Sequence, residues 1–308
     1  MRLLITGGAG FIGSNLARLA LGEGIAVTVL DDLSTGYRAN LEGLDVDFVE
    51  GSLLDPKALA RSLRDVDSVV HLGAIGSVPR SIADPMRSHA ANATGTLLLL
   101  EEARRSGVSH LVGASSSSVY GANPALPKGE REWVRPMSPY AVTKLATEQY
   151  LLAYQDSFDM KTLAFRFFNV FGPRQAAGHA YAAVIPIFID ALLSGRPLPV
   201  NGDGRHSRDF TYVGTVCQVL LEAAQQRLSH PEPVNLAFGT NTTLLELVEA
   251  LSRVTGLTPV VEHHDERAGD VKHSQADNAT LRALFPEVRP VPLEQGLAET
   301  VAWFKGER

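Results

Sequence analysis

The sequence predicts an α/β protein built on a doubly wound parallel sheet, followed by a smaller α/β domain. Three observations support this prediction. Short apolar runs alternate with helical patterns through the first half of the chain, four glycines crowd into TGGAGFIG between the first run and the first helical pattern, and Pro and Gly become frequent after about Gly172. Strands separated by helices in this way are typical of parallel sheets with right-handed crossovers.

Each element follows from its pattern. Short apolar runs predict strands over 2–6, 26–32, 46–51, 68–74, 110–121 and 162–172. Helical periodicity predicts helices over 11–24, 56–65, 92–107, 138–158, 184–195 and 243–256. We expect a first domain over 1–172 and a second over 173–308, with part of 205–240 returning to the first.

Composition excludes several classes of protein. The 308 residues carry a net charge of −6 and no long basic run, which argues against a nucleic-acid partner. No apolar run approaches the ~18 residues of a membrane span, and no secretory segment follows Met1, so we expect a cytoplasmic protein. The single cysteine, Cys217, stands in apolar VGTVCQVLL and is expected to be a buried structural thiol.

The glycine-rich stretch predicts a dinucleotide site. Gly7, Gly10 and Gly13 recur at a spacing of three between the first strand and the first helix. There the first glycine permits a tight turn, the second admits a pyrophosphate to backbone N–H groups, and the third lets helix and strand pack closely. The second strand ends in Asp31 and Asp32, where a carboxylate accepts hydrogen bonds from ribose hydroxyls and repels a 2′-phosphate. NAD is therefore favoured over NADP.

A tyrosine, a lysine and a serine run suggest acid–base chemistry. Tyr140 and Lys144 lie four residues apart in SPYAVTK, on one face of a predicted helix. An ammonium close to a phenol favours the phenolate, so the tyrosine can work as a base nearer neutral pH. The run from Ser115 to Ser118 ends a predicted strand, at the edge where doubly wound sheets bind ligands. Taken singly, these patterns also fit a solvated helix pair and a polar loop.

Together these residues resemble the extended short-chain dehydrogenase/reductase superfamily, and within it the NAD-dependent nucleotide-sugar epimerase/dehydratase family. The resemblance covers essentially the whole chain, in family order: TGGAGFIG, LDDLSTG, HLGA, SSSSVYG, SPYAVTK, RFFNVFGPRQ, NGDGRHSRDF and RAGDVKHSQAD. It implies a Rossmann domain that holds NAD, a smaller domain that binds a UDP-sugar, and a homodimer, because helices near 89–106 and 138–158 match those of a four-helix dimer bundle in relatives.

The resemblance implies a role for each matching position. Tyr140 would be the base, Lys144 would bind the nicotinamide ribose and lower the tyrosine pKa, and Ser116 would contact the sugar's 4-hydroxyl. The expected cofactor-binding residues are Gly7, Gly10, Phe11, Ile12, Gly13, Asp31, Asp32, Ser34, Thr35, Gly36, Ser52, Leu53, Leu72, Gly73, Ala74, Asn92, Ser115, Tyr140 and Lys144. The expected substrate-binding residues are Ser77, Arg80, Ser116, Ser117, Asn169, Val184, Val200, Asn201, Arg208, Arg267, Asp270 and Ser274.

Several of these roles concern the nucleotide. The resemblance assigns Asn169 to a phosphate, and Arg208 and Arg267 to the pyrophosphate, a task that suits the guanidinium fork. It places Asp270 near the uridine ribose, and the segment of Val200 and Asn201 around the uracil. One motif departs from the family, because Ser52 stands where an aspartate usually meets the adenine, which predicts weaker adenine affinity.

Ser117 and Ser118 favour one reaction of the family. Dehydratases of the family carry an acidic pair just after the catalytic Ser/Thr, and decarboxylases usually keep a glutamate there. Without an acid or base beside carbons 5 and 6, what remains is oxidation and re-reduction at carbon 4. Tyr140 would take the 4-hydroxyl proton as hydride passes to NAD⁺, and hydride would return to the other face of the 4-keto sugar. The implied activity is that of a UDP-hexose 4-epimerase, as in the interconversion of UDP-glucose and UDP-galactose.

The sugar stays open at this point. Ser274 stands where a tyrosine restricts some members to non-acetylated sugars, so an N-acetyl group as in UDP-GlcNAc has room, without glucose being excluded. Members acting on UDP-glucuronate tend to carry a threonine and an arginine where this chain has Asn169 and Ala176. The alternatives are a UDP-glucuronate 4-epimerase, a dehydratase with an unusual acid, and a non-catalytic NAD-binding regulatory protein. We expect no metal, because the histidines lack metal-ligand spacing and are read as structural or surface residues: His71, His89, His110, His263 and His264.

Overall fold

The computed structural model describes residues 1–178, 182–265 and 273–306. The chain forms two compact units. The first unit comprises Met1–Pro124, Glu130–Phe167 and Cys217–Leu236. The second comprises Ala125–Gly129, Phe168–Val216 and Ala237–Arg308. The chain therefore leaves the first unit after Phe167 and re-enters it at Cys217.

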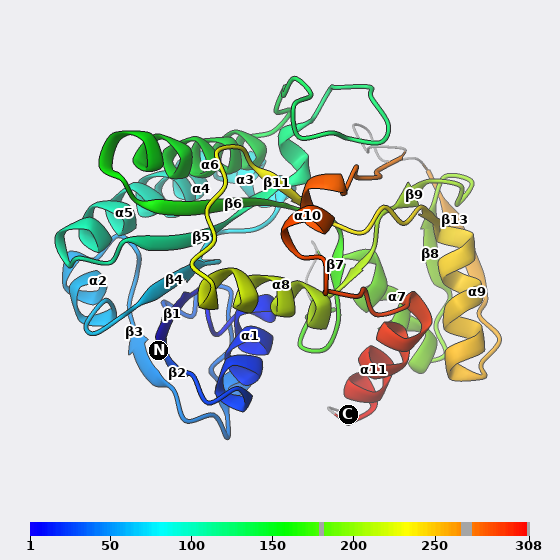
Figure 1. Ribbon diagram of the computed structural model, residues 1–308. Helices are drawn as coiled ribbons and strands as arrows, with labels where there is room; N and C mark the ends of the chain where they lie inside the picture. The colour runs from blue at the N-terminus through cyan, green and yellow to red at the C-terminus, as the bar shows by residue number, and fades with distance from the viewer. Residues whose placement is uncertain (179–181, 266–272, 307–308) are drawn as a thin grey trace. The chain divides into compact units, whose positions relative to one another are not determined.

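The first unit is built on a seven-stranded parallel sheet (Figure 1) in the order β11-β6-β5-β4-β1-β2-β3. The strands are β1 (Arg2–Thr6), β2 (Ala26–Asp31), β3 (Asp47–Glu50), β4 (Ser68–His71), β5 (His110–Ser116), β6 (Lys161–Phe167) and β11 (Val234–Leu236). The doubly wound parallel sheet predicted from the sequence is confirmed. Strand order reverses at β1, which lies between β4 and β2, and ligands bind at such switch points.

Two strand predictions need correction, and one strand of the sheet was missed. The predicted strand 110–121 ends at Ser116, because a 3₁₀ turn, η3 (Ser117–Val119), begins there with Ser116 as its cap. The predicted strand 162–172 is divided into β6 and the short β7 (Val170–Phe171). The edge strand β11 was not predicted, because three residues are too few to show a periodic pattern.

Helices cover both faces of this sheet. The helical segments are α1 (Phe11–Gly22), η1 (Arg38–Leu41), α2 (Pro56–Ser62), α3 (Val78–Ala83), α4 (Pro85–His89), the π-helical turn η2 (Ala90–Thr94), α5 (Gly95–Arg105), α6 (Pro139–Phe158) and α8 (Val213–Gln225). Figure 1 shows α2, α5 and α6 on one face, with α1 and α8 on the other. Buried residues of α2, α5 and α6 pack on the strands in one apolar core, which includes Leu59, Leu99 and Leu151. Because both faces are covered, β4 is buried along its whole length.

The second unit contains small sheets and its own helices. Its elements are β7, α7 (Val184–Leu193), β8 (Leu198–Asn201), β9 (Ser207–Arg208), β10 (Thr211–Tyr212), β12 (Thr242–Thr243), α9 (Leu244–Thr255), β13 (Val261–His264), α10 (Ala279–Leu284) and α11 (Leu293–Gly306). The strands pair as β7 with β10, β8 with β13 and β9 with β12. Helix α9 begins with a capping box between Thr243 and Glu246.

Two expectations from composition can be compared with the fold. Cys217 on α8 is buried, as predicted, and desolvation raises the pKa of its thiol. Among the helices over the described residues, none has both the length and the apolar character that crossing a bilayer would need.

Candidate active site

The glycine-rich loop joins β1 to α1 in a geometry that an anion fits. Gly7 has φ +70°, and a Cβ on Gly13 would stand 2.3 Å from the Gly7 carbonyl oxygen, so α1 packs directly on the loop. Gly10 is the cap residue of α1 and has no side chain to occupy the helix end. The first-turn amides of α1, those of Phe11, Ile12 and Gly13, therefore have no side-chain cap. A pyrophosphate suits such a helix N-terminus.

Asp31 lies against this loop. Its carboxylate accepts hydrogen bonds from the amides of Ala9, at 2.9 Å, and Leu33, at 2.8 Å. Burial raises the pKa of Asp31, and the same two amides lower it. Asp32 is exposed and accepts from the amide of Ser34 at 2.9 Å. Asp31 is therefore the carboxylate that the fold presents to the glycine loop.

The other expected cofactor residues follow the carboxyl ends of neighbouring strands. Ser34, Thr35 and Gly36 follow β2, Ser52 and Leu53 follow β3, and Leu72, Gly73 and Ala74 follow β4. Close packing joins these loops, because a Cβ on Gly36 would stand 2.9 Å from the Ala9 backbone and a Cβ on Gly7 would stand 2.8 Å from the Gly73 nitrogen. The Ser52 hydroxyl accepts from the Leu54 amide at 3.1 Å. The chemistry and placement of these residues fit a dinucleotide.

Ser116 and Tyr140 meet at the carboxyl end of β5. Tyr140 is the second residue of α6, whose cap Ser138 accepts from the Ala141 amide at 3.1 Å. Enclosure of the phenol raises the pKa of Tyr140, and a hydrogen bond with Ser116 lowers it. The Ser116 hydroxyl oxygen also accepts from the amide of Ser118, at 3.2 Å, and from its hydroxyl, at 3.0 Å. These two bonds leave the Ser116 hydrogen available for Tyr140.

Lys144 lies one turn farther along α6. Its ammonium donates to the Ala114 carbonyl at 2.9 Å, and burial lowers the pKa of Lys144 to about 8. The spacing prediction that Tyr140 and Lys144 share one helix face agrees with their positions in α6. The serine and the phenol can therefore hold and pass a proton at this edge of the sheet, and the expected effect of Lys144 on the Tyr140 pKa stays a prediction.

Two expected cofactor residues make hydrogen bonds within the fold. The Asn92 side chain, in η2, accepts from the Ile75 amide at 2.7 Å and donates to the Thr143 hydroxyl at 2.9 Å. The Thr143 hydroxyl in turn donates to the Tyr140 carbonyl at 2.8 Å. The Ser115 hydroxyl donates to Glu148 on α6 at 3.0 Å. Both side chains therefore tie the sheet and its loops to the helix that carries Tyr140.

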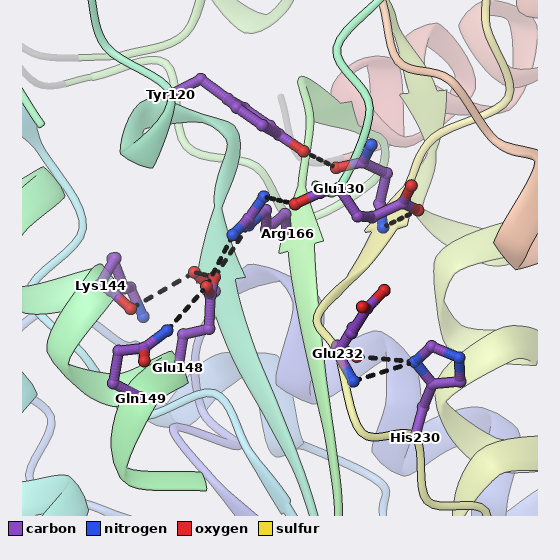
Figure 2. A network of polar contacts seen from close by, with 10 residues as sticks. Tyr120, Glu130, Lys144, Glu148, Gln149, Arg166, His230 and Glu232 are labelled. Atoms are coloured by element: carbon purple, nitrogen blue, oxygen red, sulfur yellow. Dashed lines mark hydrogen bonds and ion pairs between the residues drawn. The ribbon is translucent and has the colours of Figure 1, made fainter. Parts of the chain in front are cut away.

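Sequence reasoning missed Glu148 and Arg166. Figure 2 shows the Arg166 side chain from β6 directed at Glu148 on α6, with Lys144 one turn before. The guanidinium donates to the two carboxylate oxygens at 2.7 and 2.9 Å. The signal that could have found Glu148 is the spacing of four, which runs from Tyr140 through Lys144 to Glu148.

Expected substrate residues occur in both units. In the first unit, Ser77 caps α3 and accepts from the amide of Arg80 at 3.2 Å, and Ser117 begins η3. In the second, the Arg208 guanidinium donates to the Ser207 carbonyl at 2.9 Å, and the Ser274 amide donates to the same carbonyl at 3.1 Å.

Four further expected substrate residues of the second unit lie on or beside β8, α7 and β9. The Asn169 amide donates to the Asp209 carbonyl at 3.4 Å, which places Asn169 next to β9. Val200 is fully buried in β8, so only its backbone is available to a base, whereas Asn201 is half-buried. Val184 begins α7. Arg267 and Asp270 lie outside the described residues.

The arrangement of metal-ligating side chains can be stated for the part of the chain that the structure describes. There, no group of three or more His, Cys, Asp and Glu side chains has the geometry to hold a metal ion. His71 is buried and bonded to Thr6 and Thr96, and His110 is buried and bonded to Ser68 and the Leu228 carbonyl.

Comparison with known proteins gives a consistent result. The model of the "NAD dependent epimerase/dehydratase family" matches residues 3–237. A UDP-glucose 4-epimerase of Mycolicibacterium smegmatis is 37% identical over 100% of this chain and 99% of its own length.

Two solved structures resemble the whole chain. A UDP-N-acetylglucosamine 4-epimerase from Methanobrevibacter ruminantium has a TM-score of 0.94 and 37% identity, covering 100% of this chain and 99% of that one. A Thermus thermophilus UDP-glucose 4-epimerase in complex with NAD has a TM-score of 0.90 and 36% identity, covering 100% of both chains.

Proposed function

The chain belongs to the NAD-dependent epimerase/dehydratase family, and on that premise we propose that it is a UDP-sugar 4-epimerase. The substrate would be a UDP-hexose or a UDP-N-acetylhexosamine. The observation that carries the proposal is the placement of Tyr140, at the start of α6, with Ser116, at the carboxyl end of β5, where the serine hydroxyl lowers the pKa of the phenol. The full-length similarity to UDP-glucose and UDP-N-acetylglucosamine 4-epimerases supports it.

NAD would be held by the glycine loop and by the loops that follow β2, β3 and β4. When bound, it supplies the acceptor and donor of hydride at carbon 4 of the sugar. The chain's own residues would manage the proton. The Tyr140 phenolate, stabilised by the Ser116 hydrogen, would accept the proton of the 4-hydroxyl and return it after the sugar has turned over. The buried ammonium of Lys144 would keep positive charge close by.

The serines of η3 support epimerisation over elimination. A dehydratase needs an acid or base at carbons 5 and 6, and the residues after Ser116 are Ser117 and Ser118. Ser118 is engaged with Ser116, and neither serine titrates near neutral pH. Ser116 and Tyr140 would therefore act at carbon 4 of the sugar alone.

Product analysis tests this proposal. The purified protein with NAD should convert UDP-glucose or UDP-N-acetylglucosamine into its 4-epimer, seen by NMR, and should retain a deuterium label at carbon 4. Tyr140→Phe should lower kcat about 10²–10⁴-fold, because it removes the proton acceptor, without lowering the melting temperature. Formation of a 4-keto-6-deoxy product, turnover of UDP-glucuronate alone, or full activity in Tyr140→Phe would each contradict the proposal.

The finer features of the function remain proposals. Ser274 is a small, half-buried residue, and it supports acceptance of an N-acetyl group alongside unsubstituted hexoses. We also propose a homodimer, which light scattering would measure, and a cytoplasmic location, which subcellular fractionation would measure.

A further inference from the structure

We propose that the buried ion pair of Glu148 and Arg166 positions the catalytic residues and is not there to stabilise the fold. The inference rests on the proposed function, because it concerns how Tyr140 and Lys144 are presented to Ser116. Every residue involved lies in the first unit. Glu148 would be a positioning residue that acts through Ser115 and the backbone of α6.

The pair is enclosed and well matched. The side chain of Glu148 is 0% exposed and that of Arg166 is 4% exposed. Arg166 bonds Glu148 in a bidentate manner, donates to the Glu130 carbonyl at 3.0 Å, and stacks 4.7 Å from the centre of the Tyr120 ring. Figure 2 shows the guanidinium between Glu148 and Glu130. Bidentate pairs of this kind fix geometry as well as charge.

The pair is linked to the catalytic groups through Ser115. The Ser115 hydroxyl lies 3.0 Å from Glu148 Oε2 and 3.3 Å from the Lys144 carbonyl oxygen. Ser115 precedes Ser116 on β5, and Lys144 lies one turn from Tyr140 on α6. One carboxylate therefore holds the strand beside Ser116, the neighbouring strand β6, and the helix that carries the base.

Stability alone does not account for such a pair. Desolvation of two charges is costly, and replacing a buried pair with apolar residues of similar volume is often neutral or stabilising. Apolar contacts, however, are not directional and would permit α6 to slide along β5 and β6. Reacting groups that move by about 1 Å can lose about 100-fold in rate. The pair therefore fixes the position of α6 relative to β5, the strand that ends in Ser116. We call this role of the Glu148–Arg166 pair the register lock.

The decisive variant removes both charges together. In Glu148→Leu/Arg166→Met the local net charge is unchanged, so any shift in the titration of Tyr140 reports geometry. The titratable groups facing this region come from α6, β4, β6 and the segment after β5: Tyr140, Lys144, His71, Arg166, Tyr120 and Glu130. The difference in tyrosinate absorbance between each protein and its Tyr140→Phe counterpart isolates Tyr140.

We expect the double variant to melt at or above the wild-type temperature, with kcat lowered about 10–100-fold and KM for the sugar changed less than about two-fold. The Tyr140 titration should move to higher pH, because the Ser116 bond that favours the phenolate is weakened. Ser115→Ala should move both readouts the same way by a smaller amount. The matched control is Tyr154→Phe, which removes the 2.7 Å hydrogen bond from the Tyr154 hydroxyl on α6 to Glu101 on α5 and should move neither readout.

Wild-type kcat and wild-type Tyr140 titration in the double variant would overturn the inference. If the double variant does not fold, Ser115→Ala decides the question by the same two readouts. If the wild-type protein epimerises no UDP-sugar, the proposed function is wrong but the present inference is not. The titration of Tyr140 needs no substrate, so it still tests the register lock.

Discussion

At the scale of single residues, the site depends on which hydrogen-bond donors and acceptors are not used within the fold. Ser116 accepts two bonds from Ser118, which leaves its hydrogen for Tyr140. The Asp31 carboxylate accepts hydrogen bonds from two backbone amides. Because a carboxylate can accept about four hydrogen bonds, it can also accept from ribose hydroxyls. In the sequence, spacing pointed to Asp31 and Asp32 together, and the family resemblance pointed to Ser116. The bonds to Ala9 and Tyr140, from distant parts of the chain, appear only in the folded protein.

A substitution of Asp31 tests its assignment to the adenosine ribose. Asp31→Asn keeps the shape and loses the charge, so NAD affinity should fall about 5–10-fold, the difference between charged and neutral hydrogen bonds. The preference for NAD over NADP should narrow, because the repulsion of a 2′-phosphate is removed. Calorimetric titration measures both affinities. Asp47→Asn, an equal change at an exposed position of β3, is the control. Unchanged affinities in Asp31→Asn would place the ribose elsewhere.

At the scale of elements, α6 is the helix on which the proposed chemistry depends. Its predicted range, 138–158, matches the observed Pro139–Phe158 because Ser138 and Pro139 mark its start in the sequence itself. Where the predicted helix 92–107 should begin, the chain forms the π-helical turn η2, and the Asn92 side chain within it bonds Ile75 and Thr143. Periodicity cannot show such a distortion, because the partners are brought together only by folding.

The helix cap of α6 gives a prediction at this scale. Ser138→Ala removes the bond to the Ala141 amide and should cost about 1 kcal/mol of unfolding free energy. Because Tyr140 lies in that first turn, kcat should fall as well. Thr243→Ala, which removes the corresponding cap of α9, should cost a similar amount and leave kcat unchanged. Urea denaturation and turnover assays measure the two quantities. Equal effects of both variants on kcat would refute the link between the cap and catalysis.

At the scale of the whole molecule, two buried histidines in the central sheet make stability depend on pH. His71 on β4 and His110 on β5 are 3% and 0% exposed, and burial lowers their pKa values to about 3 and about 4 from 6.5. Between these values and 6.5 the unfolded chain binds more protons than the folded one. The free energy of unfolding should therefore fall as pH is lowered through this window.

Near pH 5 the two histidines together should contribute a slope of about 2.7 kcal/mol per pH unit. Urea denaturation at several values between pH 5 and 7 measures it. His110→Asn should remove about half of that contribution, whatever its own cost in stability. A slope that His110→Asn does not alter would mean that His110 is protonated in the folded protein.

Spacing along the chain was enough to predict the features that depend on neighbouring residues. These are the glycine turn, an acid at the end of β2, the face shared by Tyr140 and Lys144, and the alternation that makes a parallel sheet. Backbone geometry relates such residues directly, so their spacing is sufficient evidence. The pairing of Glu148 with Arg166, the choice of Asp31 as the carboxylate at the glycine loop, and the edge strand β11 became evident only in the folded protein. These contacts join distant segments, and packing of the sheet and helices selects them from many that the sequence would equally allow.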